Sequence, residues 1–413
     1  MDSDVTVTIA DIRAAREVLS KVIRPTPLKF NRALSERVGA DVFLKCENLQ
    51  RAGSFKIRGA YTRMSRLSPQ ERAAGVVAAS AGNHAQGVAL AAHMLGIASK
   101  VYMPVRAPMP KLAATRAYGA EVEQVGETLD ESLLAARAWA DETGAILIHP
   151  FDHADIVAGQ GTCGWEILDQ CPEVRTVVVG LGGGGLLAGI ATVMRALKPD
   201  VHVIGVQAEQ AAAYPDSLAA GHPVKAARMA TMADGIAVGL PGDVTFPIVR
   251  DLVDEVVTVS EASLSRAALF LLERAKLVVE PAGAAATAYL LDRAAGDGPP
   301  LEGPVVTVLS GGNIDPLLML RIIRHGMTAA GRYLQFSVVV PDSPGNLAQL
   351  LTDCASVDAN VLDVEHLRTS AEIRVDQVEI GLVLETRGPE HQSRVLEALR
   401  AKGYVLLGTD QPL

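Results

Sequence analysis

Lys56 is the residue of this chain best suited to covalent chemistry. It follows Phe55, at a point where a loop gives way to a predicted helix. The first turn of a helix carries positive partial charge, which disfavours a protonated amine and favours its neutral, nucleophilic form. Because only 4% of the residues are aromatic, Phe55 beside the lysine suggests a flat ligand stacked on its ring. Most lysines are simply solvated, so this interpretation needs support from elsewhere in the chain.

A run of glycines lies between an apolar strand pattern and a helical pattern. It comprises Gly180, Gly182, Gly183, Gly184 and Gly185, with Leu186 directly after it. Backbone N–H groups of such a loop, together with the helix N-terminus, bind phosphate. The spacing also satisfies G-x-G-x-x-G, but Glu209 only loosely matches the acid of a dinucleotide site, and no P-loop Gly-Lys-Ser/Thr follows. A structural turn explains one or two glycines but hardly four in succession, so we predict a phosphate site.

Two further strand-to-helix turns carry small and polar residues. The first comprises Ser80, Ala81, Gly82, Asn83 and His84, and the second comprises residues 310–313, beginning with Ser310. Small residues leave backbone amides free for an anion such as a substrate carboxylate, and Asn83 offers a side-chain donor. The alternative is ordinary helix capping by Ser80 or Asn83, with His84 a satisfied core or surface histidine.

Short β-branched runs alternate with helical patterns between residues 75 and 309. Strands are predicted at 75–79, 100–103, 121–124, 145–149, 176–179, 202–206 and 305–309, and helices at 83–95, 109–118, 129–142, 157–170 and 186–197. This alternation predicts an α/β fold with βαβ units and a parallel sheet covered on both faces. The turns at the carboxyl ends of parallel strands should converge with Lys56 on one crevice.

The rhythm changes near residues 329–332. The pattern then predicts a strand at 333–340, a turn at 342–345, a helix to about 356, strands at 360–368 and 377–385, a helix at 389–402 and a strand at 404–407. This βαββαβ order is that of a small ferredoxin-like unit. We therefore predict a catalytic region at 1–328, with a smaller α/β subdomain at about 45–150, and a separate domain at 333–413.

Composition excludes several classes of function. With 38 basic and 47 acidic residues, a net charge of -9 offers no basic stripe for nucleic acid. The acidic start at residues 1–4 argues against a signal peptide, and the uncharged stretch 177–194 contains too many glycines for a membrane helix. The scattered residues Cys46, Cys163, Cys171 and Cys354 have no metal-site spacing and indicate buried, reduced thiols of a cytoplasmic protein.

A reactive lysine and a phosphate cradle in one crevice indicate pyridoxal phosphate as cofactor. The motifs at 45–50, 53–60, 80–84, 180–185, 280–284 and 310–313 resemble, in this order, those of threonine ammonia-lyase (threonine dehydratase), one of the fold-type II pyridoxal phosphate enzymes. The resemblance covers about residues 5–325. The tail resembles an ACT domain, an amino-acid-sensing module, because residues 342–347 match its first strand-to-helix turn.

The resemblance implies a role for each motif residue. Lys56 would bind the cofactor covalently, Phe55 would pack against its ring, Asn83 would donate to its phenolic oxygen and Ser310 would face its pyridine nitrogen. The phosphate would be held by Gly182, Gly183, Gly184, Gly185 and Leu186, and the substrate carboxylate by Ser80, Ala81, Gly82, Asn83 and His84. The freed amine of Lys56 would remove the α-proton of L-threonine, and loss of the β-hydroxyl would lead to 2-oxobutanoate and ammonia. L-Serine would give pyruvate.

Two features depart from the racemising relatives. Ala81 replaces a serine that acts on the cofactor face opposite the lysine, and alanine carries no proton, so elimination is favoured over racemisation. Those relatives also bind a divalent cation with acids near 202–206. Gln207 and Ala213 occupy what would be the matching places here. Glu209 is an alternative ligand, but we expect no metal.

Three other functions stay open. A serine dehydratase or racemase would differ in recognising one methyl group less, worth about 1 to 3 kcal/mol. A nicotinamide-dependent oxidoreductase would explain the glycine spacing but leave Lys56 without a role. A non-catalytic amino-acid sensor would explain the tail alone.

The tail also leads us to expect isoleucine or valine as an effector and assembly into a homo-oligomer, a dimer or a tetramer. We expect neither nucleic acid nor a membrane as a partner.

Overall fold

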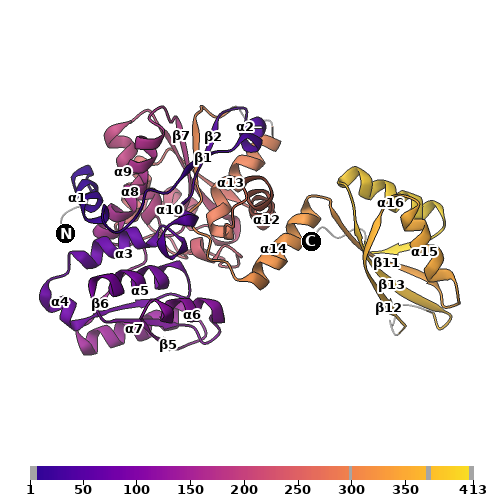
Figure 1. Ribbon diagram of the computed structural model, residues 1–413, viewed down its shortest axis with the longest axis horizontal. Helices are drawn as coiled ribbons and strands as arrows, with labels where there is room; N and C mark the ends of the chain where they lie inside the picture. The colour runs from indigo at the N-terminus through magenta and orange to yellow at the C-terminus, as the bar shows by residue number, and fades with distance from the viewer. Residues whose placement is uncertain (1–6, 297–299, 369–373, 409–413) are drawn as a thin grey trace. The chain divides into compact units, whose positions relative to one another are not determined.

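The computed structural model describes residues 7–296, 300–368 and 374–408 (Figure 1). The chain forms two units, Met1–Met319 and Leu320–Leu413, and each is described by itself. The division falls within helix α14 (Pro316–Ala329), about ten residues before residues 329–332, where the pattern of predicted strands and helices changes. The acidic start of the chain, residues 1–4, lies outside the described residues.

The larger sheet of the first unit has six strands in the order β1-β2-β10-β7-β8-β9. They are β1 (Leu28–Phe30), β2 (Val42–Lys45), β7 (Thr176–Gly180), β8 (His202–Ala208), β9 (Glu255–Val259) and β10 (Val305–Val308). All neighbours pair in parallel, as predicted, except β1, which pairs antiparallel with β2. The sequence pattern predicted β7, β8 and β10 but missed β1, β2 and β9. Helices α9 and α13 both contact β7 and β8 and lie on either side of β7 in Figure 1, so the central strands are buried on both faces.

The smaller sheet of this unit has four parallel strands in the order β5-β4-β3-β6. They are β3 (Val76–Ala79), β4 (Ser99–Met103), β5 (Glu121–Gln124) and β6 (Ile146–Leu147). Helix α4 (Pro69–Ala74) precedes β3, and the helices between the strands are α5 (Asn83–Leu95), α6 (Met109–Ala117) and α7 (Leu129–Thr143). The predicted elements are therefore present, although β6 is shorter than the apolar run 145–149 suggested. The first unit thus contains the fold-type II arrangement of two open parallel sheets with flanking helices.

The remaining helices of the first unit connect or cover these sheets. They are α1 (Ile9–Leu19), α2 (Arg32–Val38), α3 (Lys56–Ser65), α8 (Ala154–Gln170), α9 (Gly185–Leu197), α10 (Tyr214–Ala220), α11 (Thr245–Leu252), α12 (Glu261–Phe270) and α13 (Pro281–Ala295), with short turns at Glu47–Leu49, Arg51–Gly53, Glu209–Ala211, Asp234–Ile236 and Leu271–Ala275. The uncharged stretch 177–194 is divided between β7, the glycine loop and α9, as predicted. Within the described ranges, no helix is long and apolar enough to span a membrane.

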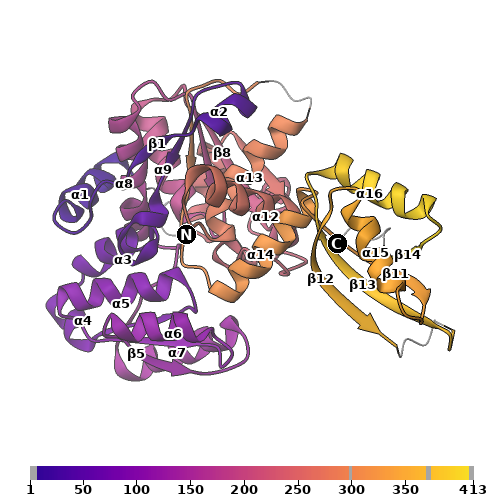
Figure 2. The ribbon, with the colours of Figure 1, turned by 45° about the vertical axis from the view of Figure 1, so that its right-hand side comes forward.

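The second unit has the predicted βαββαβ order (Figure 2). After α14 come β11 (Tyr333–Pro341), α15 (Asn346–Ala355), β12 (Asn360–Leu367), β13 (Gln377–Glu385), α16 (Pro389–Ala401) and β14 (Val405–Leu407). The antiparallel sheet has the order β12-β13-β11-β14, which is ferredoxin-like and is consistent with an ACT-like domain. Alternate residues of β11 and β13 point into the core beneath α15 and α16, so the period of two in the sequence correctly predicted these strands.

Candidate active site

Lys56 is the first residue of α3 and is partly buried. Its Nζ donates a hydrogen bond to the carbonyl oxygen of Pro150 at 2.9 Å and lies 5.1 Å from the centroid of the Phe55 ring. Burial lowers the pKa of Lys56 to about 8, although the charge of Glu280 opposes the shift. The largest cause of this shift is desolvation, and Lys56 also lies in the first turn of α3, as the sequence suggested. The amine reaches its neutral, nucleophilic form at a lower pH than an ordinary lysine.

A buried network of ion pairs anchors α3 two residues beyond Lys56. Arg58 donates to both carboxylate oxygens of Glu47 at 2.7 and 2.8 Å, and to Glu166 at 2.7 Å. Lys45 donates to the same Glu166 at 2.6 Å. The side chains of Arg58, Glu47 and Lys45 are fully buried. Two cations facing two carboxylates leave no uncompensated charge, and the bidentate pair holds the start of α3 against the turn at Glu47–Leu49.

Arg58→Ala should lower the free energy of unfolding of the first unit by about 3 to 5 kcal/mol, because it leaves the Glu47 carboxylate buried without its ion-pair partner, while Glu166 keeps Lys45. Urea unfolding followed by tryptophan fluorescence measures this, since Trp139 and Trp165 both lie in the first unit. The matched control is Arg32→Ala, which breaks an exposed pair with Glu36 and should leave the unfolding midpoint almost unchanged. Equal midpoints for the two variants would refute the anchoring role.

The glycine run connects β7 to α9 and presents a row of unused N–H groups. Gly184 has a φ of +97°, a left-handed conformation that favours glycine. A Cβ on Gly183 would lie 2.3 Å from the ring of Phe151, so this ring packs directly on the loop backbone. Within the part of the chain that the structure describes, the N–H groups of residues 182–186 donate to no acceptor. Unused N–H groups at the start of a helix form a site for an anion such as phosphate.

The turn from β3 to α5 has the same character. The Ser80 hydroxyl accepts a hydrogen bond from the N–H of Gly82 at 3.1 Å, whereas the N–H groups of Ala81, Asn83 and His84 have no acceptor among the described residues. The His84 ring bonds to the carbonyl oxygen of Ile148 at 2.7 Å, and burial lowers its pKa to about 3. The His84 side chain is thus a neutral, satisfied core group, and only the backbone of this turn is free to bind an anion.

Glu280 links two of the predicted turns and has no role assigned to it in the sequence. Its Oε1 accepts a hydrogen bond from Asn83 Nδ2 at 2.6 Å, and Asn83 Oδ1 accepts one from Asn313 Nδ2 at 2.8 Å. Burial, followed by the charge of Asp234, raises the pKa of Glu280 to about 8. The available signal was an acid directly before Pro281, the first residue of α13, inside a motif that otherwise has only small residues.

The third turn follows β10 and meets the loop before α3. The N–H of Phe55 donates to the carbonyl oxygen of Ser310 at 3.2 Å, and Ser54 pairs with Gly311 as an isolated bridge. Ser310 is 5% exposed, and Leu186 at the end of the glycine run is 4% exposed. The structure therefore brings Lys56, Phe55, Asn83 and Ser310 together. The glycine run lies next to this group, because Phe151, whose ring packs on Gly183, directly follows Pro150, which accepts the hydrogen bond from Lys56.

The three residues at the place of the racemase metal site provide few oxygen atoms that could bind a cation. Gln207 is fully buried and its Oε1 accepts the N–H of Tyr214 at 2.9 Å, Ala213 has no ligand atom, and Glu209 is exposed. No cluster of three or more His, Cys, Asp or Glu side chains that could hold a metal ion occurs among the residues with described positions.

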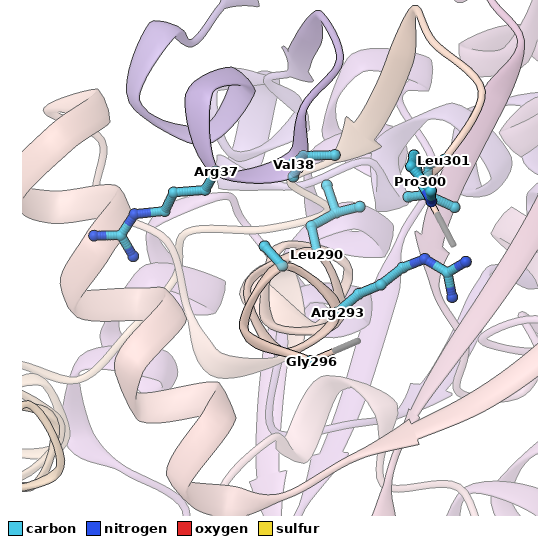
Figure 3. A pocket seen from close by; sticks show the side chains of 8 residues that line it. Arg37, Val38, Leu290, Arg293, Gly296, Pro300 and Leu301 are labelled. Atoms are coloured by element: carbon cyan, nitrogen blue, oxygen red, sulfur yellow. The ribbon is translucent and has the colours of Figure 1, made fainter. Parts of the chain in front are cut away.

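A pocket lies between α2 and the C-terminal end of α13 (Figure 3). Its lining includes Arg37, Val38, Leu290, Arg293, Pro300 and Leu301. None of these residues belongs to the turns described above, so this pocket is separate from the site around Lys56.

The chain is similar to a protein family, to a curated protein and to solved structures. Residues 19–311 match the family described as pyridoxal-phosphate dependent enzyme. The L-threonine ammonia-lyase of Geobacter sulfurreducens is 47% identical over 395 residues, which cover 96% of this chain and 98% of that protein. The structure of the processed form of threonine deaminase isoform 2 from Solanum lycopersicum has a TM-score of 0.73 and 38% identity, covering 77% of this chain and 92% of that one. The structure of maize serine racemase has a TM-score of 0.73 and 33% identity, covering 76% and 96%.

Proposed function

The chain belongs to the family of pyridoxal-phosphate dependent enzymes, and from this premise we propose that it dehydrates and deaminates L-threonine to 2-oxobutanoate and ammonia. One observation carries the proposal. The segment Pro150–Phe151 contacts both Lys56, whose pKa burial lowers to about 8, and the glycine loop with its unused N–H groups. A reactive amine and an anion cradle at the two ends of one short segment match the aldehyde and the phosphate of pyridoxal phosphate.

The residues around Lys56 and the glycine run fit the cofactor. We assign the phosphate to the N–H groups of Gly182, Gly183, Gly184, Gly185 and Leu186, the covalent link to Lys56, the ring contact to Phe55, the phenolic oxygen to Asn83 and the pyridine nitrogen to the hydroxyl of Ser310. When bound, the cofactor supplies a conjugated ring that accepts the electrons released at the substrate α-carbon. Glu280, with its raised pKa, holds the amide of Asn83 in place through the 2.6 Å hydrogen bond.

The substrate steps rest on two groups of residues. The unused N–H groups in the turn of Ser80, Ala81, Gly82, Asn83 and His84 bind the carboxylate of L-threonine. Lys56 Nζ, neutral once it is released from its covalent link, removes the α-proton. The β-hydroxyl then leaves as water, and hydrolysis releases ammonia and the 2-oxo acid.

A serine dehydratase or serine racemase is the second candidate, because a serine racemase has the same fold at 33% identity. Ala81 favours elimination, since a methyl side chain provides no proton on the face opposite Lys56. Elimination from L-serine as a side reaction remains part of the proposal, because discrimination of one methyl group is worth only about 1 to 3 kcal/mol.

The function is tested by giving the purified protein with its cofactor L-threonine or L-serine and quantifying ammonia, 2-oxo acids and D-serine. We expect equimolar ammonia and 2-oxobutanoate from L-threonine, with a higher kcat/KM than for pyruvate formation from L-serine. D-Serine as the main product would identify a racemase instead. Oxidation of either substrate with reduction of NAD, and no ammonia, would favour the oxidoreductase.

For the tail, at 333–413, we propose an amino-acid-sensing ACT domain on a cytoplasmic homo-oligomer, a dimer or tetramer. Among the described residues, the outer strands β12 and β14 each pair with another strand on one side only, which suits pairing with a second copy. The start of the turn at 342–347 lies near the C-terminal end of β12, because Arg368, directly after β12, pairs with Asp342 at 3.1 Å. All four cysteines are free and buried, which suits a reducing compartment.

A chain ending at Gly331 should keep its cofactor and its ammonia release but lose any response to isoleucine or valine. The physical requirement is that the effector binds two arrangements of the oligomer with different affinity, a coupling of about 1 to 3 kcal/mol. Rates at several threonine concentrations, with and without millimolar effector, measure it for both chains, with alanine as the control ligand. A full-length protein that ignores both branched-chain amino acids would leave the tail with an assembly role alone.

A further inference from the structure

The carbonyl oxygen of Gly183, in the middle of the glycine run, is held by two buried hydroxyl groups. Thr245 Oγ1 donates to it at 2.6 Å and the Tyr214 hydroxyl donates at 3.3 Å. Thr245 is the first residue of α11 and Tyr214 the first of α10, and both are fully buried. Neither residue has a part in the chemistry described above. Two side-chain donors on one loop carbonyl therefore call for another explanation.

Peptide geometry gives these hydroxyls a function. In a trans peptide the carbonyl of one residue and the N–H of the next point in opposite directions within a rigid plane. Holding the Gly183 oxygen from one side therefore directs the Gly184 N–H to the other side. That N–H is one of the unused donors of the loop within the described residues. Donation to the carbonyl also polarises the peptide and makes its N–H a stronger donor.

Asp152 holds the backbone of Thr245 in place. Its carboxylate accepts hydrogen bonds from the N–H groups of Asp243 at 3.0 Å, Val244 at 2.8 Å and Thr245 at 3.3 Å. A carboxylate at the start of α11 also interacts favourably with the helix dipole. Because Asp152 directly follows Phe151, whose ring packs on Gly183, the same segment contacts the loop and its support.

We propose that Thr245, Tyr214 and Asp152 are positioning residues of the phosphate site, which orient the Gly183–Gly184 peptide so that the Gly184 N–H points at the cofactor phosphate. The proposal rests on the proposed function, since it takes pyridoxal phosphate as the ligand. It predicts that these side chains govern cofactor affinity and the surroundings of the phosphate, with little effect on the KM for threonine.

The test compares Thr245→Val, which keeps the shape and removes the hydroxyl, with Thr245→Ser, which keeps the hydroxyl. The matched control is Thr192→Val, because Thr192 in α9 is also buried and donates to a backbone carbonyl, that of Ala188 at 2.9 Å, away from the loop. The readouts are the dissociation constant of pyridoxal phosphate from the holoprotein, the phosphorus NMR shift of the bound phosphate and the thermal midpoint.

We expect Thr245→Val to weaken cofactor binding by about 10- to 100-fold, the range for losing a hydrogen bond that supports a charged contact, and to move the phosphorus resonance. Thr245→Ser should stay within about threefold of the wild type, and Thr192→Val should change neither readout. Wild-type cofactor affinity and resonance in Thr245→Val would overturn the proposal, as would equal losses in Thr192→Val.

If Thr245→Val fails to fold, Tyr214→Phe carries the test, because it removes only the second donor and keeps the buried ring. It should weaken binding by about threefold or more and move the same resonance, and an unchanged constant and resonance would overturn the proposal. Failure of the proposed function is distinguishable, since a wild-type protein that holds no pyridoxal phosphate, or releases no ammonia from threonine, contradicts that function before any variant is compared.

Discussion

Lys56→Ala should abolish ammonia release from L-threonine and remove the visible absorbance of the bound cofactor. Alanine has no amine to form the covalent link, and it cannot remove the α-proton. Loss of a general base alone costs about 10²- to 10⁴-fold in rate, and loss of the link adds to that. Steady-state ammonia release and the absorbance spectrum of the dialysed protein measure the two effects separately.

The control for this variant is a lysine that is also largely buried but lies outside the site. Lys100 is 13% exposed and pairs with Glu121 at 2.9 Å and Glu123 at 2.7 Å on the smaller sheet. Lys100→Ala should retain both the spectrum and the rate. A Lys56→Ala protein that turns over threonine at a near wild-type rate would refute the mechanism as a whole.

Gly184→Asp should weaken pyridoxal phosphate binding by at least about 100-fold. A side chain at a φ of +97° is strained, which costs about 1 to 3 kcal/mol. A Cβ there would lie 2.2 Å from the Tyr214 hydroxyl and 3.0 Å from the Thr245 Cβ, so it would displace the two groups that hold the loop. The new carboxylate would also repel the phosphate. Cofactor retention on dialysis, followed by absorbance, measures the loss.

Gly144→Asp separates strain from the effect on the phosphate. Gly144 has a φ of +75° at the end of α7, and a Cβ there would meet no atom within 4 Å. This variant should lose some stability and keep its cofactor. If Gly184→Asp retains pyridoxal phosphate as well as Gly144→Asp does, the glycine run does not bind the phosphate.

Prediction from the sequence worked best where the signal was local. The periods of two and of about 3.6 residues predicted β13 at Gln377–Glu385 and α5 at Asn83–Leu95 with the bounds that the structure has, because each pattern reports which face of its own element is buried. The sequence prediction missed the first turn of α8, because it began this helix at residue 157 and the helix begins at Ala154. Its N-terminal cap is the ring of His153, which accepts the N–H of Asp155 at 3.1 Å, and histidine is not a usual capping residue.

The sequence by itself determined the order of strands and helices from β3 to β8 and in the second unit, the glycine loop before α9 and the lysine at the start of α3, because each depends on residues a few positions apart. Only the tertiary structure decided which distant groups meet. The hydrogen bond from Asn83 to Glu280, the pairing of Arg58 with Glu166 and the contact of Thr245 with Gly183 join residues that lie 197, 108 and 62 positions apart. No periodic pattern encodes such pairings, since they depend on how the sheets place the ends of separate elements. The low pKa of Lys56 belongs with them, because burial by those elements removes the amine from water.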